Sequence, residues 1–150
     1  MAFIHDFLFG KEITYTDSKL GELKTRTRKF KANAQKVWMG ELLIAGQKSK
    51  TVILLDGSAE KPSDRQINAM HKLIDSVTEI HRKAESVWRR NPEHTAVLDD
   101  DWLNHYYLAA INPLDAEENS FELSYEPDEE KAIEGITLIW KNSRITETED

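Results

Sequence analysis

The sequence predicts an α+β fold in which an antiparallel sheet of about 7–8 strands packs against one long helix over residues 63–90. Three observations predict this fold. Short strand-like segments lie on both sides of a single stretch with helical periodicity. Strands do not alternate with helices, which argues against a parallel sheet of βαβ units. The 150 residues are 39% hydrophobic and 31% charged, which suits a single domain over residues 1–150.

Four strand segments precede the predicted helix. Residues 13–16 and 20–30 are expected to form a hairpin, because Asp17-Ser18-Lys19 supplies a turn between them. Residues 37–44 form the next predicted strand. Residues 51–55 follow as an uninterrupted run of β-branched residues and leucine, which is typical of a central strand buried on both faces.

The predicted helix over residues 63–90 has apolar residues at three- and four-residue spacing. They form one stripe that can pack on a sheet. Ser63 is the expected N-cap, with Gln66 three residues later as its capping-box partner. Asn91-Pro92 ends the helix, because a proline disfavours helical geometry in the residue before it. His81 falls within the stripe, and we expect it to be a hydrogen-bonded core histidine.

The segments after the helix complete the predicted sheet. Residues 93–104 are expected to hold a short second helix. Residues 105–111 fit a helix or a strand, and Tyr106-Tyr107 with the following Asn112-Pro113 favours the strand. Further strands are predicted at residues 120–125, 134–140 and 144–146.

The absence of cysteine excludes disulfides, cysteine-ligated metal clusters and thiol nucleophiles. The first ten residues have no basic leader, and His5 and Asp6 interrupt their apolar character, so no signal peptide is predicted. No segment approaches the roughly 20 apolar residues of a membrane span. We therefore expect a bacterial cytoplasmic protein that does not contact a membrane.

Charge is distributed unevenly along the chain. The formal net charge is −7, yet residues 1–50 hold 10 basic and 5 acidic side chains, whereas residues 101–150 hold 3 and 13. Two explanations stay open. Basic strands can pair with acidic strands within one sheet. Alternatively, the acidic third forms a surface that attracts a basic partner.

The acidic final part of the chain supplies the candidate partner-binding residues. Three aspartates directly precede Trp102, and an exposed tryptophan rimmed by acids is typical of an interface hot spot. The alternative is that Trp102 pins the short second helix to the core. We assign partner binding to Asp99, Asp100, Asp101, Trp102, Glu117 and Glu118, and expect a basic protein as the partner.

Signals of enzyme chemistry are weak. The chain has no Gly-x-Ser-x-Gly motif and no glycine-rich phosphate loop. His94 and His105 flank the aspartates, and histidine with carboxylates can hold a divalent ion, so a metal-assisted enzyme is one alternative function. Their spacing matches no metal-binding motif. The sequence therefore favours a non-enzymatic role and predicts no catalytic residue, no metal and no cofactor.

Nucleic-acid binding through Lys24–Lys31 is a second alternative. The basic side chains of this segment alternate with threonines and therefore share one strand face, where they can contact phosphates. Phe30 could stack on a base. The net charge of −7 opposes this function, because an acidic protein repels nucleic acid at long range.

The order of elements resembles a group of small bacterial α+β domains of uncharacterised function, some of which are toxin-immunity proteins. The segments that carry the resemblance are Leu20-Gly21-Glu22-Leu23, Val52-Ile53-Leu54-Leu55, the helix after Pro62-Ser63-Asp64, and the tail segments 121–128 and 135–140. The resemblance implies a cytoplasmic interaction protein that neutralises a toxin by direct binding. It supplies no catalytic residue.

Overall fold

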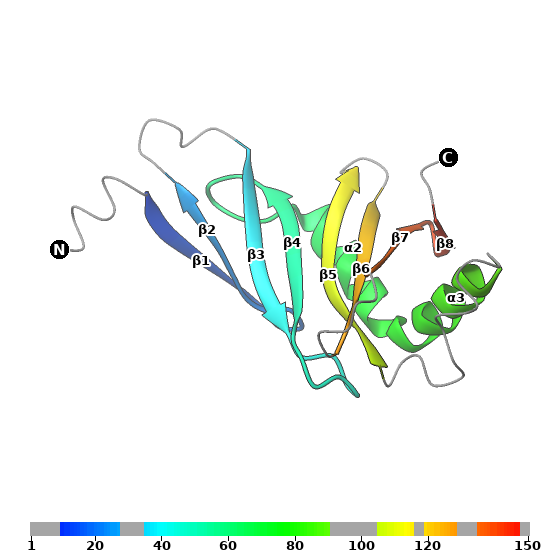
Figure 1. Ribbon diagram of the computed structural model, residues 1–150. Helices are drawn as coiled ribbons and strands as arrows, with labels where there is room; N and C mark the ends of the chain where they lie inside the picture. Colours follow the sequence, from blue (N-terminus) through cyan, green and yellow to red (C-terminus); the bar gives the residue numbers. More distant parts are fainter. Residues whose placement is uncertain (1–9, 28–34, 91–104, 116–118, 129–134, 148–150) are drawn as a thin grey trace.

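In the described part of the chain, eight strands form one sheet in sequence order from β1 to β8 (Figure 1). This computed structural model describes residues 10–27, 35–90, 105–115, 119–128 and 135–147. The strands are β1 (Lys11–Asp17), β2 (Gly21–Thr27), β3 (Lys36–Leu42), β4 (Thr51–Gly57), β5 (Tyr106–Asp115), β6 (Ser120–Pro127), β7 (Ile136–Lys141) and β8 (Arg144–Thr146). The helices α2 (Asp64–Asp75) and α3 (Val77–Arg89) lie between β4 and β5 along the chain. The predicted α+β class is confirmed.

Neighbouring strands are antiparallel except at the centre of the sheet, where β4 and β5 run parallel. The expectation of a wholly antiparallel sheet is therefore wrong at this one pair. A parallel pair needs a crossover connection, and the segment that contains α2 and α3 supplies it. Two antiparallel meanders, β1–β4 and β5–β8, are joined by this parallel pair.

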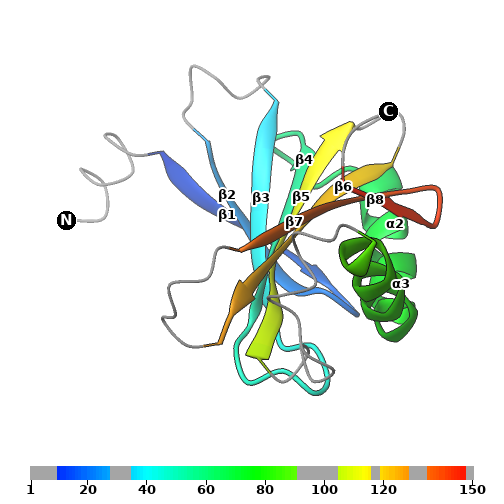
Figure 2. The ribbon, with the colours of Figure 1, turned by 45° about the vertical axis from the view of Figure 1, so that its right-hand side comes forward.

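The single helix expected over residues 63–90 is two shorter helices that meet at Ser76. Ser76 has φ −103° and ψ 12°, outside α-helical geometry. Its N–H still donates to the Lys72 carbonyl at 3.1 Å, and its carbonyl accepts from the Ile80 N–H at 2.9 Å. The change of direction therefore costs little hydrogen bonding. It lets α2 pack near β4 while α3 reaches β8 along a twisted sheet (Figure 2).

The core lies between the helices and one face of the sheet. Alternate residues of each strand point into it, as the period of two in a β-strand requires. Its fully buried sheet residues include Trp38, Ile53, Leu55, Ile111, Leu123 and Leu138, and α2 contributes Met70 and Leu73. The apolar stripe that the sequence predicts on the helical segment thus packs on the sheet as expected.

Side chains reinforce the parallel pair at the centre of the sheet. The ladder between β4 and β5 is short, with Val52 opposite Ala110 and Ile53 opposite Ile111. Gln47 accepts a hydrogen bond from the Leu108 N–H at 2.9 Å and donates to the Thr51 hydroxyl at 3.0 Å. The Thr51 hydroxyl in turn donates to the Leu108 carbonyl at 2.6 Å. These bonds add side-chain contacts between the two meanders beside their short backbone ladder.

The start of α2 is fixed to the end of β4. Ser63 is the N-cap as predicted, since its Oγ accepts from the Gln66 N–H at 3.4 Å. The reciprocal half of the capping box is wrong. Gln66 is buried and bonds Asp56 instead: its Oε1 accepts from the Asp56 N–H at 2.6 Å, and its Nε2 donates to Asp56 Oδ2 at 2.9 Å. The Ser63 N–H donates to the Asp56 carbonyl at 2.8 Å, so strand and helix share one clamp.

Candidate interaction surface

The face of the sheet that points away from α2 and α3 carries exposed apolar side chains. Along β3 and the residues after it, Val37, Met39 and Leu43 are 55%, 54% and 57% exposed. Trp38 lies between the first two and is fully buried on the opposite face. The alternation of a β-strand therefore separates two apolar sets, and the helices cover only one of them (Figure 1).

Cross-strand neighbours extend this exposed set onto β4. Met39 lies opposite Leu54, and both Leu54 and Val52 are half-buried. We name Val37, Met39, Leu43, Val52 and Leu54 the apolar strip. Antiparallel sheets commonly leave one face to solvent, and the residues of that face are then usually polar. The apolar character of the strip is therefore unusual for the open face of a mostly antiparallel sheet.

Charged residues flank the apolar strip. On β2, Lys24 lies opposite Met39, and its Nζ is 3.6 Å from the Glu12 carboxylate. Arg26 lies 3.4 Å from the same carboxylate. On the other side, Glu41 is opposite Val52 and pairs with Lys50 at 3.8 Å. An apolar centre with a charged rim is the usual anatomy of a protein–protein interface.

The residues assigned to partner binding from the sequence lie outside the described residues. The same is true of His94, the predicted helix within residues 93–104, and residues 28–31 of the basic segment. His105 is described and is exposed at the start of β5. Within the described ranges, no group of three or more His, Cys, Asp and Glu is placed to hold a metal ion. The residues outside the description are Asp99, Asp100, Asp101, Trp102, Glu117 and Glu118.

His81 is hydrogen-bonded as predicted, but it is half-buried at the edge of the core. Its Nδ1 lies 2.9 Å from the hydroxyl of Tyr125, which is fully buried on β6. Burial lowers the pKa of His81 to about 4 and raises the pKa of Tyr125, so both groups are neutral near pH 7. The hydrogen bond between the tyrosine hydroxyl and Nδ1 therefore joins two uncharged groups. This pair places one polar contact inside the covered face.

His71 has a different partner from His81. Its Nε2 lies 2.8 Å from Oδ1 of Asp17, the last residue of β1. The same oxygen accepts from the Lys19 and Leu20 N–H groups at 2.9 and 2.8 Å. Burial raises the pKa of Asp17, but the Leu20, His71 and Lys19 hydrogen bonds outweigh it and leave the pKa below its ordinary value. The dyad fastens the first hairpin to α2.

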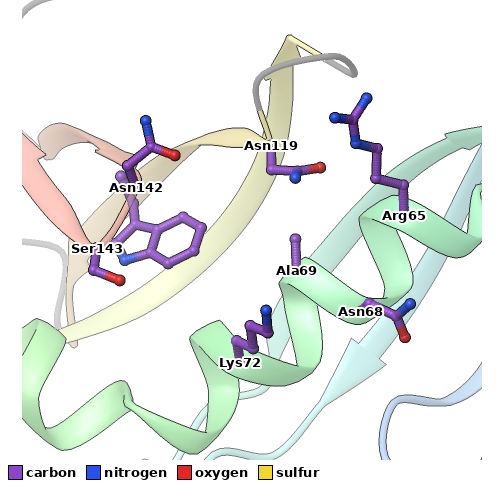
Figure 3. A pocket seen from close by; sticks show the side chains of 8 residues that line it. Arg65, Asn68, Ala69, Lys72, Asn119, Asn142 and Ser143 are labelled. Carbon is purple, nitrogen blue, oxygen red and sulfur yellow. The ribbon is translucent and has the colours of Figure 1, made fainter.

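A pocket of about 330 Å³ lies between α2 and the β7–β8 hairpin (Figure 3). Its wall on α2 includes the cations Arg65 and Lys72, and its opposite wall includes amide and hydroxyl groups. Every described non-glycine residue with a positive φ lies on that opposite wall: Asn119 at 51°, Asn142 at 50° and Ser143 at 61°. We name this cavity the α2 pocket. Its lining residues are Arg65, Asn68, Ala69, Lys72, Asn119, Trp140, Asn142 and Ser143.

Sequence reasoning missed both the apolar strip and the α2 pocket. The run from Val37 to Ile44 is apolar at alternate positions on both faces, which is a signal that one apolar set needs separate cover. The pocket has a fainter signal, because Arg65 and Lys72 lie at i and i+7 of one helix face. The sequence does not show that this face lies opposite Asn119 and Asn142.

Comparison with known proteins finds no protein-family model, no curated protein and no solved structure that matches this chain.

Neither α2 nor α3, the helices within the described ranges, is long and apolar enough to cross a membrane.

Proposed function

We propose that this chain is a protein-binding domain whose partner covers the apolar strip. The observation that carries the proposal is that Val37 and Met39, on one face of the sheet, are each more than half exposed, as is Leu43 directly after β3. Removing apolar surface from water is favourable by about 25 cal/mol per Å², so a complementary partner gains affinity by covering these side chains. Charged neighbours at the rim supply orientation and specificity.

The specific role we propose is neutralisation of a bacterial toxin in the cytoplasm by direct binding. The net charge of −7 and the acidic last third of the chain favour a basic partner. A nuclease toxin fits, because its active site is often basic to hold phosphate. In this proposal the acidic residues speed the encounter, and the apolar strip supplies the buried contact. The acidic residues are Asp99, Asp100, Asp101, Glu117 and Glu118, with Trp102 beside them.

Affinity capture from the host lysate, followed by mass spectrometry, tests the apolar strip. The baits are the natural chain, Met39→Glu and Ser86→Glu. Both variants add one negative charge at an exposed position, and Ser86 lies on α3, away from the apolar strip. We expect a stoichiometric basic protein on the natural chain and on Ser86→Glu, and its loss from Met39→Glu. Equal capture by all three baits would exclude the apolar strip as the binding surface.

The acidic residues are tested with the captured partner. Replacing Asp99, Asp100 and Asp101 by asparagine should slow association several-fold at low salt and flatten its salt dependence. An unchanged association rate would remove those residues from the encounter.

Capture of nucleic acid alone would favour binding through Lys24–Lys31. A stoichiometric divalent ion on the native protein, without a protein partner, would favour an enzyme near His94 and His105.

A further inference from the structure

We propose that the α2 pocket binds a small organic anion with two acidic groups and a hydrogen-bond donor between them. This inference is independent of the apolar strip, because residues of α2 line the pocket and the apolar strip lies on the other face of the sheet. It rests on the charge of the pocket, the spacing of its cations and an unsatisfied amide. Each of these observations narrows the class of ligand.

The charge of the pocket is the first observation. On α3, three cations pair with acids of the same helix, namely Arg82, Lys83 and Arg89. Arg65 and Lys72 on α2 form no ion pair with any described residue. Asp75, three residues after Lys72, pairs with Lys19 instead. A chain of net charge −7 thus keeps two cations at a pocket that no described acidic side chain lines. Such a pocket attracts an anion.

The spacing of the two cations sets the shape of the anion. Arg65 and Lys72 are separated by seven residues, or about 10.5 Å along the helix axis at 1.5 Å per residue. Ala69 lies between them, and its small side chain leaves the space open. In Figure 3 the Lys72 amine points toward this space, and Arg65 rises at its other end. One small anion such as a single carboxylate would leave one cation unpaired. A ligand with two separated acidic groups matches both.

The opposite wall indicates which chemical group the ligand carries between its two acidic groups. Asn119, Asn142 and Ser143 offer neutral hydrogen-bonding groups there. The Asn119 Oδ1 atom is buried and has no hydrogen-bond partner among the described residues. An unsatisfied buried acceptor is costly, and rotation of the amide toward the pocket would let a hydroxyl or ammonium group of the ligand satisfy it. A hydroxy- or amino-substituted dicarboxylate therefore fits better than a plain one.

The opposite wall is also held in place before a ligand arrives. Asn142 and Ser143 form the turn of the β7–β8 hairpin, and Lys83 on α3 donates to the Ser143 carbonyl at 3.0 Å. Residues held at positive φ often occur at ligand sites, where surrounding structure fixes them. The fastening to α3 keeps the hairpin at a set distance from α2. A ligand then binds without ordering the wall, which reduces the entropic cost of binding.

Isothermal titration calorimetry at low ionic strength tests the proposal with malate, succinate and pyrophosphate as probes. The variants are Arg65→Gln and Lys72→Gln, and Arg82→Gln is the control because it removes the same charge from an exposed position of α3. We expect one binding site for malate, weaker binding of succinate, and a loss of at least tenfold in affinity in both pocket variants. Arg82→Gln and Met39→Glu should bind like the natural chain. Pyrophosphate binding in place of malate would assign phosphate as the acidic group.

Two results would overturn the proposal. An equal loss of affinity in Arg82→Gln would mean that only the overall charge matters. The site would also be excluded if none of the three probes bound either the natural chain or the double variant Glu117→Gln/Glu118→Gln. These two carboxylates precede Asn119 in the sequence, and the double variant removes their negative charge from the chain. Thermal unfolding of each variant checks that the fold is intact.

Discussion

The two faces of the sheet differ in how their apolar side chains are covered. On the helix side, Trp38 and Leu55 are fully buried, whereas their chain neighbours Met39 and Leu54 lie on the other face and remain accessible to solvent. The same two strands supply both sets, so residue type alone does not decide which set is buried. The position of α2 and α3 decides it. Stability is therefore expected to depend on the covered face, and binding on the open one.

The two faces also differ in their polar contacts. The covered face has polar groups in buried hydrogen bonds, whereas the polar contacts of the open face are accessible to solvent. The half-buried His81 bonds the buried Tyr125 at the edge of the core, and Thr51 bonds Leu108 at the parallel pair. On the open face, Lys24 and Arg26 both contact Glu12, and these pairs are accessible to solvent. Surface ion pairs contribute little to stability, whereas buried hydrogen bonds are costly to lose. The two faces should therefore respond differently to mutation and to pH.

The largest expected effect comes from truncating neighbouring leucines of β4. Leu55→Ala removes a fully buried side chain from the covered face and should cost about 2–5 kcal/mol of unfolding free energy. Leu54→Ala removes the same atoms from the open face and should cost about 1 kcal/mol or less, because Leu54 is only half-buried. Urea denaturation measures both. Similar costs for the two variants would show that the open face is covered in the free chain.

The buried histidine predicts how the stability of the covered face depends on pH. The pKa of His81 is about 4 in the folded state, against 6.5 for an unperturbed histidine. Above pH 6.5 the imidazole is neutral in both the folded and unfolded states, and its full contribution is present. Between pH 6.5 and 4 only the unfolded state takes up the proton, so stability falls by a total of about 3 kcal/mol. In His81→Gln, the slope of unfolding free energy against pH should decrease in this range by the amount that corresponds to one proton taken up on unfolding.

Carboxylates also titrate toward the acid end of that range, so the comparison is between variant and natural chain. His71→Gln serves as the control, because His71 contacts Asp17 outside the core. If His81→Gln kept the slope of the natural chain, the imidazole would have to be protonated or solvated in the folded state. That result would contradict the buried Tyr125 contact.

A buried hydroxyl gives the next smaller effect. Thr51→Val keeps the shape of the side chain but removes the hydrogen bonds to Gln47 and Leu108 at the parallel pair. Gln47 Nε2 still donates to the Leu108 carbonyl at 3.4 Å, but the short bond from the Thr51 hydroxyl is lost inside the core, and we expect a cost of about 1–2 kcal/mol. Thr137→Val on β7 is the matched control, since Thr137 is exposed, and it should change stability by less than about 0.5 kcal/mol. Equal effects would mean that the Thr51 bonds contribute nothing net.

The sequence was sufficient to predict the described strands, but not the break in the helical segment or the parallel pairing of β4 with β5. The strands on both sides of the helical segment follow from alternation and β-branched runs, and Tyr106-Tyr107 correctly favours a strand over a helix. The break at Ser76 has no local signal, because residues 63–90 contain no proline or glycine. Its cause is tertiary, since one straight helix cannot follow a twisted sheet. The parallel pair likewise depends on where the segment after α3 returns to the sheet.

The apolar strip could not be predicted from the sequence for a related reason. Alternation predicts that Val37 and Met39 share a face opposite Trp38, but it does not say which face the helices cover. The α2 pocket joins residues of a helix and a hairpin that are more than 45 positions apart in the sequence. Periodicity is a local property and cannot bring Arg65 to Asn119 or Asn142. An acidic run is contiguous in the sequence and can be recognised there. An apolar surface combines residues of several strands and can be recognised only once the strand pairing is known.

The smallest expected effect is the sharpest test of the open face. The double variant Val37→Thr/Met39→Thr keeps good strand-forming residues and replaces two exposed apolar side chains. If the face is open in the free chain, the free energy of unfolding should change by about 0.5 kcal/mol or less. Capture of the partner should nevertheless fall strongly, because the apolar contact is gone. A loss of about 2 kcal/mol or more, as expected for truncation of buried side chains, would instead mean that the apolar strip is already buried in the free chain. A second copy or another part of the protein would then cover it. Size-exclusion chromatography at two protein concentrations separates these two cases.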